Sequence, residues 1–353
     1  MKILIIKLSS IGDIVHTFPA IIDATANVEN ITIDWLIDDN FKDVPELLNF
    51  SANLNNNIIP ISLRDIKKNI NFNNIKNFLA KLLSLKTAQY DLIIDAQGLL
   101  KSALIAKFIK KNSKIVGFNW GYCKESIASV FYDYKFNIEK QLHAVTRIRK
   151  LFAAALNYNI DNQENYINFG LEQKKFFKLE ELTNKKIDNY IVLLHGTTWE
   201  TKEWPIQYWQ KLSELLNQNN IKIVVSFYND KEQKLIKELA LNNNNITILY
   251  DLNIMQIARM LANAMAVVAV DTGFAHLAGA IGVPTIGIFG PTCTHKSKIM
   301  GKASVNLQSN YHCAPCLSRV CLEYKHKRSN IKQPCLKEIT PEMVYSKLQS
   351  IKS

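Results

Sequence analysis

The sequence predicts an α/β protein built from two Rossmann-like domains, and three observations support this. Short buried strands alternate with amphipathic helices in both halves of the 353-residue chain. The alternation becomes weak and polar between residues 159 and 189, and it restarts at residue 190. Repeated strand–helix units favour parallel sheets, and this length allows two separate cores. We expect an N-terminal domain at 1–170, a C-terminal domain at 186–340 and a C-terminal helix at 341–353, with the two domains facing a central cleft.

Short apolar runs predict the strands, and helical periodicity predicts the helices between them. The first half is expected to contain strands at 3–6, 31–37, 91–96 and 114–117. Its helices are expected at 14–28 and 143–156, with one further helix that ends near residue 86 and another that ends at residue 110. The second half is expected to contain strands at 190–194, 221–226, 246–250, 266–270 and 285–289, with helices at 205–217, 231–241, 254–263, 275–281 and 341–351. Polar, Asn-rich stretches occupy 53–57 and 67–77.

The net charge of +12 predicts a basic surface, suited to an anionic membrane leaflet or a phosphorylated substrate, or simply to a solvated exterior. The lysines are dispersed and nothing resembles a nucleic-acid module, so we expect no nucleic-acid partner. Apolar runs are too short to span a bilayer, and the N-terminus does not resemble a signal peptide. A cytoplasmic location is therefore expected.

The segment 267–292 is the most informative part of the chain. A buried strand runs into the turn Asp271-Thr272-Gly273, and a small-residue helix containing His276 follows. Such a turn places backbone N–H groups and the positive end of a helix dipole at the carboxyl edge of the sheet, where they can bind phosphate. The alternative is an ordinary crossover with Asp271 as a helix cap.

A second loop, 195–205, follows the first strand of the same domain. Thr197, Thr198 and Lys202 supply hydroxyls and a positive charge suited to a diphosphate, although an ordinary solvated lysine is the alternative. Glu232 opens a helix at the same edge, where it can accept hydrogen bonds from ribose hydroxyls or simply stabilise the helix dipole. Leu252 is a candidate wall against a base, although core packing alone explains a leucine there.

The first domain carries a different loop after its first strand. The glycine fingerprint G-x-G-x-x-G of dinucleotide enzymes is missing, which disfavours an oxidoreductase. The loop instead holds Ser10, Gly12 and Asp13. Asp13 is a candidate general base, with a helix-capping role as the alternative. A basic cluster could dock an anionic acceptor or form a solvated face; its members are Arg64, Lys67, Lys68 and Lys101.

Four of the six cysteines lie close together near the C-terminus. They have the spacing C-x2-C-x4-C-x13-C and are Cys313, Cys316, Cys321 and Cys335. Thiols at this spacing suit a structural zinc ion, with free thiols as an equal alternative; an iron–sulfur cluster and a catalytic metal are disfavoured.

Several motifs together resemble the lipopolysaccharide heptosyltransferase family: KLSSIGDIVHTFPA, YDLIIDAQGLLKSA, HGTTWETKEWP and VDTGFAHLAGAIGVPTIGIFGPT. The first-domain motifs look most like the branch that adds the first heptose. The resemblance implies an inverting GT-B glycosyltransferase of lipopolysaccharide inner-core synthesis. Its donor would be ADP-L-glycero-β-D-manno-heptose and its acceptor the first Kdo of Kdo2-lipid A, at the cytoplasmic face of the inner membrane.

By position, the resemblance assigns Asp13 as the general base and requires no metal for catalysis. It places the ADP-heptose contacts at Thr197, Thr198, Lys202, Glu232, Leu252, Asp271, Thr272, Gly273 and His276. The acceptor site would include Ser10, Gly12 and the basic cluster. Two departures are Phe227-Tyr228 in place of Trp-Gly, and the cysteine-rich tail, which is closer to the branch that adds the second heptose. Alternatives are that branch or another core-sugar transferase, and a non-catalytic nucleotide-sugar-binding protein.

Overall fold

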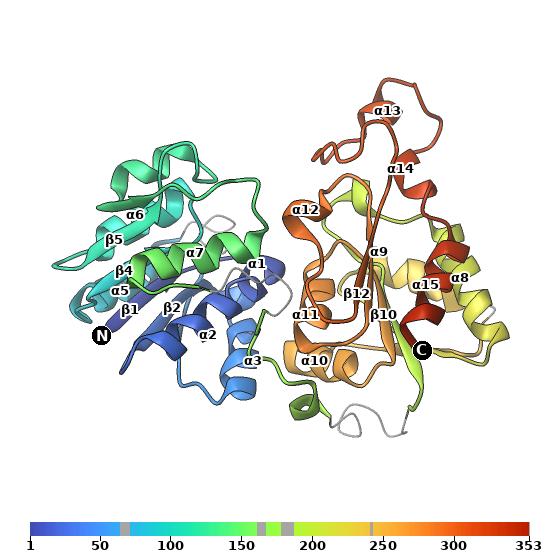
Figure 1. Cartoon of the computed structure of the whole chain (residues 1–353), viewed down its shortest axis with the longest axis horizontal. Helices are drawn as coiled ribbons and strands as arrows, with labels where there is room; N and C mark the ends of the chain where they lie inside the picture. Colours follow the sequence, from blue (N-terminus) through green and yellow to red (C-terminus); the bar gives the residue numbers. More distant parts are fainter. Residues whose placement is uncertain (64–70, 161–166, 178–186, 241–242, 353) are drawn as a thin grey trace. The chain divides into compact units, whose positions relative to one another are not determined.

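The computed structural model describes residues 1–63, 71–160, 167–177, 187–240 and 243–352. The chain forms two compact units, Met1–Gly170 (unit 1) and Leu171–Ser353 (unit 2), and each contains a parallel sheet covered by helices (Figure 1). Within the described residues, no helix combines the length and apolar character needed to cross a membrane.

The sheet of unit 1 has six parallel strands in the order β3-β2-β1-β4-β5-β6. The strands are β1 (Lys2–Ile6), β2 (Thr32–Asp38), β3 (Asn57–Ile61), β4 (Leu92–Asp95), β5 (Lys114–Phe118) and β6 (Tyr134–Phe136). The chain passes from β1 to β2 on one side and later returns to β4 on the other. The loops after β1 and β4 therefore meet at a topological switch point, where α/β proteins usually bind ligands.

The helices of unit 1 depart from the sequence prediction at two places. They are α1 (Ile11–Val15), α2 (Phe18–Asn27), α3 (Asp43–Ala52), α5 (Phe72–Thr87), α6 (Leu100–Ile109) and α7 (Ala144–Leu156), with 3-10 turns η1 (Asp39–Phe41) and η2 (Ser126–Phe131). The continuous helix predicted at 14–28 is wrong: it breaks after Val15, and Thr17 becomes the N-cap of α2 with Pro19 in its first turn. Proline there lacks an N–H that an unbroken helix would need. The elements α3, β3 and β6 were not predicted.

The sheet of unit 2 also has six parallel strands, in the order β12-β11-β10-β7-β8-β9. They are β7 (Tyr190–Leu194), β8 (Lys222–Ser226), β9 (Ile246–Leu249), β10 (Ala266–Val270), β11 (Thr285–Phe289) and β12 (Ser304–Gln308). All residues of β7, β10 and β11 are buried, as expected for central strands covered on both faces. Because β7 and β10 are neighbours, the switch point lies between them.

Helices surround this second sheet. They are η3 (Gln173–Phe176), η5 (Glu200–Lys202), α8 (Ile206–Gln218), α9 (Asp230–Ala240), α10 (Ile254–Ala262), α11 (Gly273–Ile281), α12 (Thr294–Ser297), α13 (Leu322–Lys325), α14 (Pro334–Lys337) and α15 (Pro341–Lys352). The small residues of α11 allow close packing: a Cβ on Gly279 would come within 2.5 Å of Ile299 and 2.8 Å of the Met300 carbonyl oxygen. The C-terminal helix α15 belongs to unit 2.

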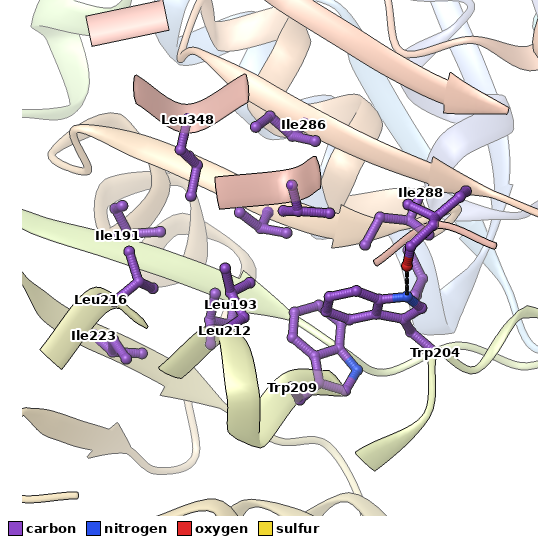
Figure 2. Packing of buried hydrophobic residues seen from close by; sticks show 14 of the residues in the cluster. Ile191, Leu193, Trp204, Trp209, Leu212, Leu216, Ile223, Ile286, Ile288 and Leu348 are labelled. Atoms are coloured by element: carbon purple, nitrogen blue, oxygen red, sulfur yellow. Dashed lines mark hydrogen bonds between the residues drawn. The ribbon is translucent and has the colours of Figure 1, made fainter. Parts of the chain in front are cut away.

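The core of unit 2 joins segments that are distant in sequence (Figure 2). The indole rings of Trp204 and Trp209 meet edge to face with centroids 4.9 Å apart, and Leu348 of α15 belongs to the same buried cluster. The Trp204 Nε1–H donates to the carbonyl oxygen of Ile339 over 2.9 Å. This bond and the packing fix the end of the 195–205 loop against the C-terminal part of the chain.

Candidate active site

Three side chains predicted from sequence come together at the switch point of unit 2. Asp271 follows β10, and its Oδ2 accepts a hydrogen bond from Lys202 Nζ over 2.7 Å. Its Oδ1 lies 3.3 Å from His276 Nε2 in the first turns of α11. The alternative reading of Asp271 as an N-cap is wrong, because Thr272 occupies that position. The carboxylate instead connects the β7 loop to the α11 start.

Electrostatics keep this carboxylate ionised. Burial alone would raise the pKa of Asp271, but the hydrogen bond from His276 and the charge of Lys202 outweigh it and hold the pKa well below the usual range. Lys202 also lies over the ring of Trp199, with Nζ 4.6 Å from the centroid. A lysine ammonium has three donors, and Asp271 takes one of them. Lys202 is thus held in place while keeping capacity for an anionic ligand.

The β7 loop places hydroxyls and a carboxylate beside this group. Thr197 Oγ1 is 3.5 Å from the backbone oxygen of Asp271, and Thr198 is exposed. Glu232, in the first turn of α9, accepts from Tyr228 N over 2.8 Å and from Asn229 Nδ2 over 3.0 Å. A Cβ on Gly196 would come within 2.5 Å of Glu232 Oε1. Only glycine lets this loop lie directly against the Glu232 carboxylate.

Apolar groups line the ends of β8 and β9. Leu252 is partly exposed in the loop that leads into α10. Phe227, one of the two residues that replace Trp-Gly, meets Tyr250 edge to face with ring centroids 5.3 Å apart. Tyr228 is 76% exposed. These positions follow β8, the neighbour of β7, and β9, the next strand beyond it, so they can flank a ligand bound at Thr197 and Lys202.

In unit 1, Asp13 lies at the corresponding switch point. It is the third residue of α1, and Ser10 is the N-cap, so Asp13 is not the N-cap itself but completes a capping box with Ser10. Asp13 Oδ2 accepts from the Ser10 backbone N–H over 3.3 Å, and Oδ1 lies 3.8 Å from Lys7 Nζ. The Asp13 side chain keeps 33% exposure. The carboxylate is therefore held in place and open to a ligand.

Lys7 is a neighbour of Asp13 for which no role was predicted. It follows β1, is 5% exposed, and donates from Nζ to the Ala96 carbonyl oxygen over 3.0 Å. Burial lowers the pKa of Lys7, while the charge of Asp13 opposes that effect. Gln97 fixes the same loop, since its Oε1 accepts from the backbone N–H groups of Leu8 and Ser9. The signal in the sequence was only the position of Lys7 at a strand end.

Lys124 is a second basic neighbour that the sequence analysis missed, with Nζ 4.0 Å from Asp13 Oδ2. The loop that carries it is held by Arg147, whose Nη2 donates to the Tyr122 carbonyl oxygen over 2.6 Å. Glu125 contributes as well, accepting from the Leu100 backbone N–H over 2.7 Å. An irregular loop has no periodicity, so this position left no pattern to find. The resulting group joins a carboxylate and two ammonium groups, which suits a hydroxyl acceptor that also carries an anion.

The other predicted acceptor residues are placed as follows. Ser10 is exposed, Gly12 is buried in α1, and Lys101 is exposed in the first turn of α6. Arg64, Lys67 and Lys68 lie outside the described residues.

A buried histidine in unit 2 was quoted in the sequence analysis without a role. His195 follows β7 directly and is 6% exposed. Burial lowers its pKa to about 4, so the imidazole is neutral near pH 7. The imidazole therefore adds no charge beside the phosphate-binding candidates.

The four predicted cysteine ligands line one cavity of about 140 Å³ in unit 2. Burial raises the pKa of the Cys335 thiol to about 12, with a smaller contribution from the other three thiols. Across the described part of the chain, no group of three or more His, Cys, Asp or Glu side chains is arranged to hold a metal ion. The thiols therefore share a cavity but not the geometry of a metal centre.

Comparisons with known proteins agree with this arrangement. The family model described as glycosyltransferase family 9 (heptosyltransferase) matches residues 79–327. Lipopolysaccharide heptosyltransferase 1 of Pseudomonas aeruginosa is 34% identical over 360 residues, which cover 99% of this chain and 98% of that protein.

Two solved structures share the fold over nearly the full length. The E. coli heptosyltransferase WaaC with ADP has a TM-score of 0.83 and 29% identity, covering 99% of this chain and 100% of the other. WaaC with ADP-2-deoxy-2-fluoro heptose has a TM-score of 0.80 and 29% identity, covering 99% of each chain.

Proposed function

Because this chain belongs to glycosyltransferase family 9, the heptosyltransferases, and transfers heptose in lipopolysaccharide inner-core synthesis, we propose that its donor is ADP-L-glycero-β-D-manno-heptose and its acceptor the first Kdo of Kdo2-lipid A. The two Rossmann-like units are those of a GT-B glycosyltransferase. The observation that carries the proposal is the Lys202–Asp271–His276 group beside the start of α11.

Donor binding is assigned to unit 2. Lys202 and the backbone N–H groups at the start of α11 neutralise the diphosphate, and Thr197 and Thr198 donate hydroxyl hydrogen bonds to it. Glu232 accepts from the ribose hydroxyls, and Leu252 contacts the adenine. Asp271 positions Lys202, and Thr272 and Gly273 allow the phosphates to approach the helix end. The structure of WaaC with an ADP-heptose analogue supports this donor class.

Acceptor activation is assigned to Asp13. Its carboxylate takes the proton from the Kdo hydroxyl as the oxygen attacks the anomeric carbon, and the carbon–oxygen bond to ADP breaks with inversion. Lys7 and Lys124 place positive charge beside the Asp13 carboxylate. Lys124 and Lys101 carry positive charge that can bind the acceptor carboxylates. Negative charge that develops on the leaving ADP is stabilised by Lys202, with no metal in the step.

Purified protein, ADP-heptose and Kdo2-lipid A test both assignments. Wild type should transfer heptose, and Asp13→Asn should lose about 10²–10⁴-fold in kcat while it still binds ADP. Transfer only to heptosylated Kdo2-lipid A would reassign the protein to the second addition. ADP binding without transfer to either acceptor by the wild type would leave a nucleotide-sugar-binding protein.

We also propose that the protein acts at the cytoplasmic face of the inner membrane. A lipid-anchored acceptor and the net charge of +12 support contact with an anionic leaflet. Binding to vesicles that depends on neither anionic lipid content nor salt would contradict this proposal.

Finally, we propose that the cysteine cavity takes a structural zinc ion. Support comes from the shared cavity and from the preference of zinc for thiolates, whose side chains would need to rotate toward the ion. The metal content of purified protein tests it: wild type and Cys293→Ser, which lies outside the cavity lining, should retain one zinc per chain. Cys313→Ser/Cys335→Ser should lose it. Metal-free wild type would establish free thiols instead.

A further inference from the structure

Two helices of unit 1 expose large apolar side chains that have no role in the proposed reaction. Helix α5 exposes Ile75, Leu79 and Leu83 at 37%, 42% and 52%, and α6 exposes Leu104 and Phe108 at 48% and 38%. Leucines 82 and 85 of α5 are buried in the core of unit 1, so the exposed residues do not serve as its packing face. We call these five residues the α5–α6 face.

The α5–α6 face is continuous. Ile75, Leu79 and Leu83 follow one another at intervals of four residues and therefore form a row along one side of α5. Lys86, three residues after Leu83, extends this row, and its Nζ lies 5.5 Å from the centroid of the Phe108 ring of α6. The two helices also pack against each other. The row on α5 consequently borders the exposed side of α6.

Positive charge surrounds this apolar surface, and neither helix contains Asp or Glu. Their lysines are Lys76, Lys81, Lys86, Lys101 and Lys107. The first carboxylate after α5 is Asp91, which accepts from the backbone N–H of Lys2. At the start of α6, the Glu125 carboxylate accepts from the Leu100 backbone N–H. Apolar residues among cationic side chains, on helices that carry no carboxylate of their own, fit the interface of an anionic bilayer: the apolar groups enter the acyl boundary and the lysines reach the headgroups.

We propose that the α5–α6 face docks unit 1 on an anionic lipid bilayer. This rests on the proposed function, since a lipid-anchored acceptor must be met at a membrane surface. Pairing with a second copy through the same face is disfavoured, because the lysines of the two copies would oppose each other. An exposed apolar area of this kind on a soluble domain marks an interaction site.

The test uses full-length protein and sedimentation with vesicles. Wild type should bind vesicles of phosphatidylglycerol and phosphatidylcholine and bind pure phosphatidylcholine weakly. Leu83→Glu should lower the partition coefficient about tenfold or more, since it replaces one inserted leucine by a charge. Met343→Glu is the matched control: it adds the same charge at a helical position of similar exposure in unit 2, and it should bind like wild type.

Each result decides the proposal. Absence of wild-type binding to anionic vesicles, or equal binding by Leu83→Glu, would overturn it, as would a wild-type dimer in sedimentation velocity that Leu83→Glu dissociates. Transfer to a deacylated, water-soluble Kdo acceptor should be equal in wild type and Leu83→Glu, while transfer to vesicle-embedded acceptor should fall. If the wild type transferred heptose to neither acceptor, the proposed function would be rejected. Vesicle binding would still decide whether the α5–α6 face docks on a bilayer.

Discussion

Replacing Lys202 with methionine removes the ammonium group that faces the buried carboxylate of Asp271. The two side chains are 15% and 7% exposed and lie 2.7 Å apart. Their attraction is about 6 kcal/mol at an effective dielectric constant near 20, and truncating one partner of a buried pair typically destabilises by about 3–5 kcal/mol. His276 remains beside Asp271. We therefore expect unit 2 to lose about 2–3 kcal/mol of its free energy of unfolding at pH 7.

The effect of Lys202→Met should depend on pH in a defined direction. In the wild type the pKa of Asp271 is held below its unfolded value, so its ionisation stabilises the fold above about pH 4. This stabilisation is lost as pH falls through the lower, folded-state pKa. The difference between variant and wild type should consequently be largest near neutral pH and narrow below pH 4.

Hydrogen exchange followed by mass spectrometry measures this loss within unit 2 alone. Peptides covering β7 and β10 should lose protection in Lys202→Met. The control is Lys110→Met, which removes a more exposed pair with Asp133 in unit 1 and should lower the free energy of unfolding by less than about 1 kcal/mol. Lys202→Met/Asp271→Leu should regain most of the protection, because both charges are removed. Unchanged protection of β7 and β10 in Lys202→Met would refute the reasoning.

Three further substitutions in unit 2 have predictable effects. Gly196→Ala should raise the KM for the donor about tenfold with little change in kcat, because its Cβ would displace Glu232; steady-state kinetics with an unaltered donor KM would contradict it. His195→Leu should make the free energy of unfolding less dependent on pH between 6.5 and 4. The pKa of His195 is about 4 in the folded protein and near 6.5 in the unfolded chain, so the wild type loses up to about 3 kcal/mol of its free energy of unfolding as pH falls across that range. Thermal unfolding across that range checks this, and parallel curves would reject it. Trp204→Phe should cost about 1–3 kcal/mol by leaving the buried carbonyl of Ile339 without its donor, and urea midpoints equal to wild type would show that water replaces the indole.

The strand–helix alternation predicted most of the central elements because parallel strands are uniformly apolar. The buried strands β7, β10 and β11 lie where the apolar runs place them. Sequence reasoning missed the edge strands β6 and β12. It also failed for α3 and β3, whose residues 43–61 include prolines and an Asn-rich stretch that weaken any period. It also missed the break at Thr17, where a cap and a proline interrupt an otherwise helical pattern.

The candidate site was predictable where it depends on topology. Asp271 and Lys202 were expected to lie close together because loops after strands of one parallel sheet meet at one edge, and the structure joins them directly. Lys124 could not be found this way, since its position depends on contacts of Arg147 and Glu125 with an irregular loop. Long-range contacts of this kind leave no spacing in the sequence.

The attachment of the 195–205 loop to the C-terminal region has a consequence for the order in which the protein becomes functional during synthesis. Thr201 Oγ1 donates to the Ser318 carbonyl oxygen, and Trp204 donates to Ile339. At about 5–20 residues per second, the ribosome makes Ile339 roughly 7–27 s after Trp204. Throughout that interval the indole rings lack their final cover and Lys202 lacks a fixed loop. A nascent chain therefore exposes apolar surface, which can bind chaperones or aggregate, before it can hold its nucleotide. All of unit 1 is synthesised before this interval begins.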